Sequence, residues 1–319
     1  MLSIDYQDEF IITAEIRENE KDNPNASLIY HGSGNSINDA LENISLSINK
    51  VLYLVDLNTV IITKNIIKNK MDNTLDYLTR ASNIGYNFRL IVSNEKIDDI
   101  IKIIKDKNKI VGSYLRDTIT NTNNNTINIK YNDLLINYLS KYQDTIFTYC
   151  TIENDNISLK NAIMLNKDKE LVFLNNDDVV IYNLLNNDLN NGIFPINYEN
   201  KDIVYRIKSI KNKIEYKDKI IINIDLVGNF NEIENINLNK ETINKIKKKV
   251  KNNIKNKISK TLDKTIENNI DVFGFKKIIY NKQKNDIESI NNLDYEININ
   301  IKIEREELIF NALGENNEI

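Results

Sequence analysis

Residues 243–266 read INKIKKKVKNNIKNKISKTLDKTI and carry the strongest pattern in the chain. An isoleucine, valine or leucine recurs at every third or fourth position, which is the spacing of one face of a helix. The apolar positions are Ile243, Ile246, Val250, Ile254, Ile258, Leu262 and Ile266. We therefore predict one long helix that lies across a sheet.

Strand patterns flank this helix on both sides. Residues 201–216 and 219–227 are predicted as two strands, because apolar and polar residues alternate there. Residues 294–304 return to the same alternation after the helix. The C-terminal domain is therefore expected to be a ββαβ unit over residues 198–319.

The N-terminal part, residues 1–122, predicts a domain with the element order ββαβαβα. Its expected elements are a hairpin of residues 8–16 and 27–31, a helix capped by Ser36, a strand at 51–62, a helix over 64–83, a strand at 87–93 and a helix over 95–105. This alternation is typical of a mixed α/β layer.

A smaller middle domain is expected over residues 123–197. The tract NTNNNT at 121–126 predicts a linker, and Gly192 and Pro195 mark a second boundary. The expected elements between them are a helix over 132–142, a strand at 145–152, a hairpin within 157–174 and a helix over 176–188. The predicted fold class is α+β, with three mixed α/β domains whose sheets are largely antiparallel or mixed and carry helices on one face.

The composition excludes several kinds of site. The chain has 319 residues, a net charge of −4, one histidine and one cysteine. The balanced charge does not favour nucleic acid, and one histidine with one cysteine is too few for a disulfide or structural zinc. No run approaches the ~18 apolar residues of a membrane span, and residues 1–10 lack a signal-peptide pattern. We expect the chain as given to be soluble, monomeric and without cofactors.

The segment HGSGNS, residues 31–36, allows three interpretations. A glycine-rich loop at a helix start can bind phosphate, and His31 beside Ser33 could form a base and a nucleophile. The segment lacks the known phosphate-loop spacings, and no third group is predicted to orient His31. We therefore favour a turn that ends the hairpin and caps the next helix, with Gly32 and Gly34 supplying backbone freedom.

The remaining reactive side chains are assigned structural roles. Cys150 lies in an alternating strand pattern, so we expect a buried thiol and not a nucleophile. The acidic runs at 175–178 and 304–307 are expected in solvent, and the first of them suits a helix start through the helix macrodipole. We predict no catalytic, cofactor-binding or metal-binding residues.

Lysines cluster on the outer face of the long helix. They are Lys245, Lys247, Lys248, Lys249, Lys251, Lys255, Lys257, Lys260 and Lys264. Such a cluster could contact anionic lipid or an acidic partner, or could simply cover the solvent side of a sheet-packed helix. The candidate contact residues are Lys245, Lys248, Lys249, Lys255 and Lys260.

Five parts of the chain occur in an order that is informative. They are LSIDYQDEFIITAEI from residue 2, HGSGNSINDALENIS from 31, LYLVDLNTVIITKNIIKNKMDNTLDYLTRASNIGYNFRLIVSN from 52, ISLKNAIMLNKDKELVFLNNDD from 157, and NNIDVFGFKKIIY with INNLDYEININIKI from 268 and 290. Together they resemble the Ger(x)C family, the lipoprotein C subunits of spore germinant receptors. The sequence departs from the family pattern at Asp56, where the family often has His, and at Asn161, where it has Gly.

The resemblance implies a three-domain fold without catalytic activity. It also implies assembly with the membrane subunits A and B of a germinant receptor, on the outer face of the spore inner membrane, through a lipid anchor that is not in this sequence. We therefore predict a non-enzymatic, membrane-associated signalling subunit that acts in nutrient-triggered spore germination through protein contacts. A small-molecule-binding extracytoplasmic domain, with a site between domains, is the alternative, and a hydrolase that uses His31 or paired carboxylates is the least favoured hypothesis.

Overall fold

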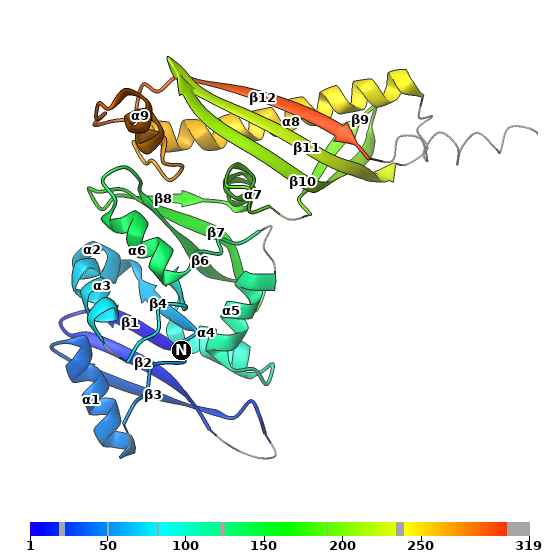
Figure 1. Cartoon of the computed structure of the whole chain (residues 1–319). Coiled ribbons are helices and arrows are strands. Elements are labelled where there is room, and N and C mark those ends of the chain that lie inside the picture. Colours follow the sequence, from blue (N-terminus) through cyan, green and yellow to red (C-terminus); the bar gives the residue numbers. More distant parts are fainter. Residues whose placement is uncertain are drawn as a thin grey trace, which may run out of the picture. The chain divides into compact units, whose positions relative to one another are not determined.

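The computed structural model describes residues 1–18, 23–49, 51–81, 83–121, 125–189, 191–233 and 239–304. Its contacts divide the chain into two compact units, Met1–Asn176 and Asp177–Ile319. Helices and mixed sheets form both units, which confirms the predicted α+β class (Figure 1). The division into three domains at residues 122 and 197 stays a prediction.

Unit 1 is built on a mixed sheet, which has eight strands among the described residues in the order β3-β2-β1-β4-β5-β6-β7-β8. The strands are β1 (Leu2–Tyr6), β2 (Phe10–Arg17), β3 (Ser27–Gly34), β4 (Thr59–Thr63), β5 (Arg89–Ser93), β6 (Thr145–Glu153), β7 (Asn156–Leu165) and β8 (Leu171–Leu174). β1, β4, β5 and β6 are parallel, and the others are added antiparallel at the two sides. Strands from both sides of residue 122, the predicted first domain boundary, therefore belong to one sheet.

Helices cover both faces of this sheet. One face carries α1 (Ile37–Ile48), α2 (Lys64–Asn69), α3 (Met71–Arg80) and α6 (Tyr131–Leu139), and the other carries α4 (Ile97–Lys105) and α5 (Val111–Asn121). We expected helices on one face only. The central strands bury apolar side chains in both directions, as Ile61 and Ile91 show beside their neighbours Val60 and Val92.

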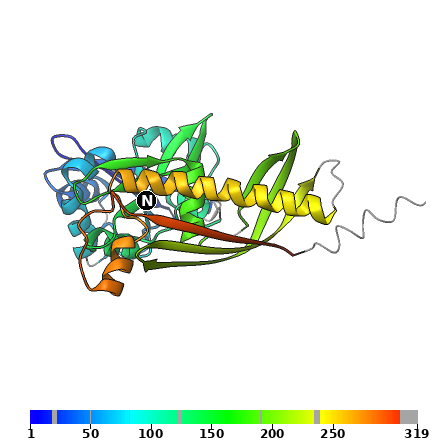
Figure 2. The same cartoon turned by 90° about the horizontal axis from the view of Figure 1, so that it is seen from above.

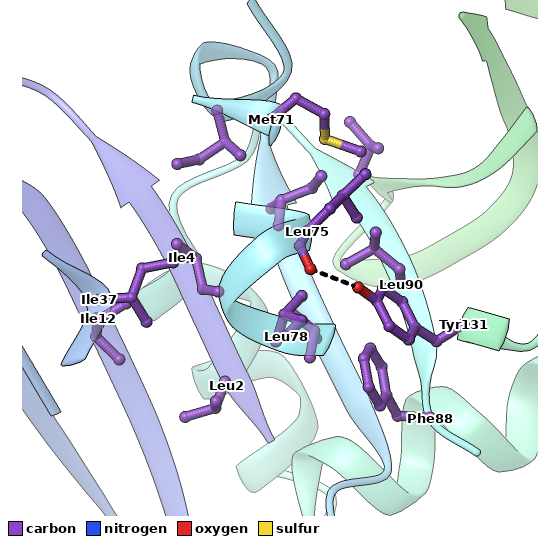
Figure 3. Close-up of a cluster of buried hydrophobic side chains, with 14 of the residues drawn as sticks. Leu2, Ile4, Ile12, Ile37, Met71, Leu75, Leu78, Phe88, Leu90 and Tyr131 are labelled. Atoms are coloured by element: carbon purple, nitrogen blue, oxygen red, sulfur yellow. Dashed lines mark hydrogen bonds between the residues drawn. The ribbon is translucent and has the colours of Figure 1, made fainter. Parts of the chain in front are cut away.

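The larger core of unit 1 lies between the sheet and the helices α1, α2, α3 and α6. Figure 3 shows Leu2 and Ile4 of β1 in this cluster, on the same side as Leu75 of α3. The rings of Phe88 and Tyr131 stack with their centroids 4.4 Å apart. The Tyr131 hydroxyl donates to the Leu75 carbonyl oxygen at 3.0 Å, which gives this buried polar group a partner.

The predicted strand at 51–62 is wrong over most of its length. Pairing begins only at Thr59, and the preceding residues form turns and irregular backbone. Leu54 and Leu57 are buried there without strand pairing, which explains why the run looked like a core strand. The predicted helix over 64–83 is interrupted at Lys70, whose φ of −140° is not helical. This residue ends α2, and α3 begins at the next residue.

Unit 2 contains a sheet with the order β12-β11-β10-β9. Its elements are α7 (Asn176–Leu185), β9 (Ile193–Tyr198), β10 (Lys201–Lys217), β11 (Lys219–Ile233), α8 (Lys240–Glu267), α9 (Phe275–Gln283) and β12 (Tyr295–Ile303). β9, β10 and β11 are antiparallel neighbours, and β12 pairs parallel to β11. The predicted ββαβ order is thus present, with β9 and α9 added.

The predicted long helix is confirmed as α8. All seven apolar positions of its stripe are buried, and isoleucines that alternate along β11 and β12 are buried too. Figure 2 shows α8 extended along the strands of this sheet. Twenty-eight residues at about 1.5 Å each make the helix about 42 Å long. Pro195, which we expected at a boundary, lies in the edge strand β9, where a missing N–H is tolerated.

Candidate functional site

His31 is not placed in a turn. It lies in β3 opposite Thr13, it is exposed, and its Nδ1 atom is 3.1 Å from the Thr13 hydroxyl oxygen. Ser36 is the N-cap of α1 as predicted, since its hydroxyl accepts from the Asp39 N–H at 3.1 Å. The histidine therefore points to a strand partner, and HGSG completes the strand before the helix begins.

Gly32 and Gly34 serve close packing instead of backbone freedom. Neither has a positive φ. A Cβ atom on Gly32 would lie 2.6 Å from the Ala40 carbonyl oxygen and 2.6 Å from Ile44, and one on Gly34 would lie 2.6 Å from the Ala40 nitrogen. The two glycines let α1 approach β3 without a side chain between them.

Cys150 is buried in β6, as predicted. Burial raises the pKa of its thiol to about 12, with a smaller contribution from the charge of Glu95. The thiol therefore stays protonated at neutral pH, which makes it a poor nucleophile.

The acidic residues at the start of α7 have structural partners. Asp178 is buried, contrary to our expectation of solvent exposure, and its carboxylate accepts from the Thr261 hydroxyl at 2.9 Å and from Lys264 Nζ at 2.5 Å. Asp177 is exposed and lies 3.0 Å from Lys257 Nζ. These contacts tie α7 to α8. In the second acidic run Glu304 pairs with Lys208, and residues 305–307 lie outside the described residues.

The predicted lysine cluster separates into inner and outer members. Lys257 and Lys264 are the inner ones, since they bind Asp177 and Asp178. The five candidate contact residues, Lys245, Lys248, Lys249, Lys255 and Lys260, are all exposed.

Two of these exposed lysines have a neighbour within unit 2. Lys245 Nζ lies 2.6 Å from Glu241, whose carboxylate raises the lysine pKa, and Lys249 Nζ lies 5.7 Å from the ring centroid of Tyr198. Lys248 and Lys260 form no ion pair with the described residues.

The segment of residues 51–55 exposes apolar side chains that the sequence analysis did not single out. Val51, Tyr53 and Val55 are 72%, 81% and 62% exposed, while Leu54 between them is buried. The run VLYLV is apolar at every position, so we assigned all of it to a buried strand, and the sequence held no signal that Val51, Tyr53 and Val55 face solvent. This segment is a candidate surface for a partner.

A depression of about 420 Å³ opens in unit 1 at the carboxyl ends of β1, β4 and β5. Asp5, Lys64, Lys68 and Glu95 bring both signs of charge to its wall. The Asp5 carboxylate accepts from the Thr63 hydroxyl at 2.5 Å, which fixes one side of the wall. The carboxyl ends of parallel strands are common positions for ligands.

The described residues contain no group of three or more His, Cys, Asp or Glu side chains that could hold a metal ion. None of the helices described by the structure combines the length and apolar character needed to cross a bilayer.

Comparisons with known proteins give a consistent result. The spore germination protein N-terminal domain matches residues 1–152, and the spore germination B3/GerAC-like C-terminal domain matches residues 160–307. The spore germination protein GerQC of Bacillus cereus is 26% identical over 192 residues, which span 59% of this chain and 54% of GerQC. The crystal structure of the GerBC protein has a similar fold, with a TM-score of 0.63 and 15% identity, over 95% of this chain and 96% of that one.

Both matching families are families of spore germination proteins, and neither is a family of enzymes. The fold and the two matched domains thus define a spore germination protein of the germinant-receptor class. The chain belongs to the Ger(x)C family, whose members are C subunits of such receptors, and this confirms the resemblance seen in the sequence.

Proposed function

We propose that this chain is the C subunit of a germinant receptor and acts without catalysis, by contacts with the membrane subunits A and B. The observation that carries the proposal is the ordered match of both family domains to residues 1–152 and 160–307. In this role the chain sits on the outer face of the spore inner membrane by means of a lipid anchor and transmits the nutrient signal.

The apolar segment of residues 51–55 is the surface that we assign to these contacts. Tyrosine is among the residues that contribute most to protein interfaces, and exposed apolar side chains gain free energy when a partner covers them. Val51 and Tyr53 are both more than two-thirds exposed in this chain, so a partner would remove much apolar surface from water.

Co-purification of the chain with tagged A and B subunits tests the proposal. The double variant Val51→Ser, Tyr53→Ser should reduce recovery of the complex and slow nutrient germination. The matched control is Ile136→Ser, Leu139→Ser in α6, where two apolar side chains are 58% and 73% exposed. Equal loss in both variants would reject the assignment of residues 51–55, and no co-purification of the unmodified chain would reject the receptor role.

A second candidate function is small-molecule binding in the depression at the ends of β1, β4 and β5. Its volume of about 420 Å³ is in the range of ligand sites. Its wall contains two cationic side chains, Lys64 and Lys68, and two anionic ones, Asp5 and Glu95. A thermal-shift screen with amino acids, sugars and nucleosides distinguishes the two functions. A saturable rise in melting temperature supports the binding function, because a ligand of the folded state stabilises it.

A further inference from the structure

The helix α8 carries a strong excess of positive charge. Residues Lys240–Glu267 include ten lysines against three acidic residues, Glu241, Asp263 and Glu267. Every exposed residue of this helix is a lysine, an asparagine, an aspartate or a glutamate. The apolar stripe is buried on the opposite side, so the outer surface of α8 is cationic and fully polar.

The lysines that stabilise unit 2 differ from those that face outward. Lys257 and Lys264 bind Asp177 and Asp178 and are about one-quarter and one-third exposed, at 27% and 33%. Lys248, Lys249 and Lys260 are exposed and form no ion pair with the described residues. The charges of Lys248 and Lys260 are thus available to a partner without loss of an ion pair, and Lys249 has only its contact with the ring of Tyr198, whose centroid is 5.7 Å from Nζ.

We propose that the outer face of α8, formed by Lys248, Lys249, Lys255 and Lys260, binds the anionic headgroups of a phospholipid surface. Lys248 and Lys260 are twelve residues apart, so the four charges spread over about 18 Å of helix. A single small anion cannot contact charges that far apart, whereas a layer of headgroups can. Each lysine near an anionic leaflet strengthens binding by about fivefold.

The composition of this face favours lipid over an acidic protein. Protein interfaces centre on Tyr, Trp, Phe, Met and Arg and are depleted in Lys, and the exposed positions of α8 contain none of these anchors. Lysine acts as a mobile point charge without directional pairing, which suits a fluid headgroup layer. This inference goes beyond the receptor role and does not depend on it.

Vesicle sedimentation with the full chain tests the proposal. We expect the unmodified chain to bind vesicles containing phosphatidylglycerol, to bind pure phosphatidylcholine vesicles weakly, and to lose binding as salt is raised. The variant Lys248→Gln, Lys249→Gln, Lys255→Gln, Lys260→Gln should bind anionic vesicles about 600-fold more weakly, since each of the four lysines contributes about fivefold. Its melting temperature should be unchanged, because none of the four is buried.

The matched control changes the same number of charges elsewhere in unit 2. Lys276→Gln, Lys277→Gln, Lys282→Gln, Lys284→Gln removes four lysines of or next to α9. Retained vesicle binding in this control, with loss in the α8 variant, supports the proposal. Equal loss in both variants, or no binding of the unmodified chain at low salt, overturns it. Binding to soluble poly-glutamate that matches binding to vesicles at equal charge also overturns it, in favour of an acidic protein partner. Vesicles contain no receptor subunits, so none of these results bears on the co-purification test.

Discussion

Lys264 Nζ in α8 lies 2.5 Å from Oδ2 of Asp178, whose carboxylate is buried at the start of α7. Thr261, three residues earlier on the same helix, donates its hydroxyl to Oδ1 of the same carboxylate at 2.9 Å. This arrangement joins α7 and α8 of unit 2 through residues that are more than eighty positions apart in the chain.

Replacing Asp178 with Ala should therefore lower the free energy of unfolding by about 3 kcal/mol, since the change leaves a partly buried Lys264 and a buried hydroxyl without their acceptor. Urea denaturation of the full chain measures the loss. The control is Asp177→Ala, whose side chain is 64% exposed, and which should cost less than about 1 kcal/mol. Similar effects of the two changes would show that the buried pair is not stabilising.

Glu15 offers a second test of a long-range contact. Its carboxylate accepts the N–H groups of Val111 and Gly112 at 2.7 and 2.9 Å, and the Ser27 hydroxyl at 2.8 Å. Glu15→Ala leaves these donors unsatisfied in a buried place and should destabilise the chain by about 3 kcal/mol or more. Glu15→Gln keeps one acceptor oxygen and should lose less. Hydrogen exchange should accelerate at Val111 and Gly112 in the Ala variant, and unchanged exchange there would contradict the capping role.

Gly32 should not tolerate a side chain. In Gly32→Ala the new methyl group would lie 2.6 Å from the Ala40 carbonyl oxygen, so α1 must shift away from β3. We expect a loss of about 1–3 kcal/mol, seen as a lower melting temperature. Gly85→Ala is the control, because its nearest neighbour is the Val55 carbonyl oxygen at 3.2 Å. An unchanged melting temperature for Gly32→Ala would mean that the helix is less closely packed than described.

Cys150 should be unreactive in the folded chain. With a pKa of about 12, roughly one thiol in 10⁴ is ionised at pH 8, so Ellman's reagent should label it slowly until urea is added. The folded state holds this proton more tightly than the unfolded state, so the contribution of the thiol to stability is constant below about pH 9 and falls as the pH rises toward 12. Rapid labelling of the native chain would contradict the burial.

Local sequence patterns correctly predicted the elements whose buried face is visible as a regular spacing of apolar residues. The stripe of α8 and the alternation of β11 needed no knowledge of distant residues. The helix α5 was missed because part of its N-terminal cap is Glu15, nearly one hundred residues away. The strand β1 was missed although LSIDY alternates apolar and polar residues, because five residues are a short pattern and the strand's parallel partner β4 lies more than fifty residues away.

For the candidate surfaces, too, local sequence patterns predicted only what does not depend on distant residues. The outward lysines of α8 could be listed from helix periodicity alone, since helical spacing fixes which side chains oppose the stripe. Periodicity could not reveal that Lys257 and Lys264 bind carboxylates of α7. Nor could it separate exposed Tyr53 from buried Leu54, because all five residues of VLYLV are apolar and show no periodicity.

The tight turn between β6 and β7 has a consequence for how the chain can be divided. The two matched family segments end at residue 152 and begin at residue 160, within this hairpin. A fragment ending at residue 152 would leave β6 without its antiparallel partner β7, and a fragment starting at residue 160 would keep β7 paired with β8 but without β6. The two matched segments are therefore not independent folding units, and a segment exchanged between relatives must include both strands of the hairpin.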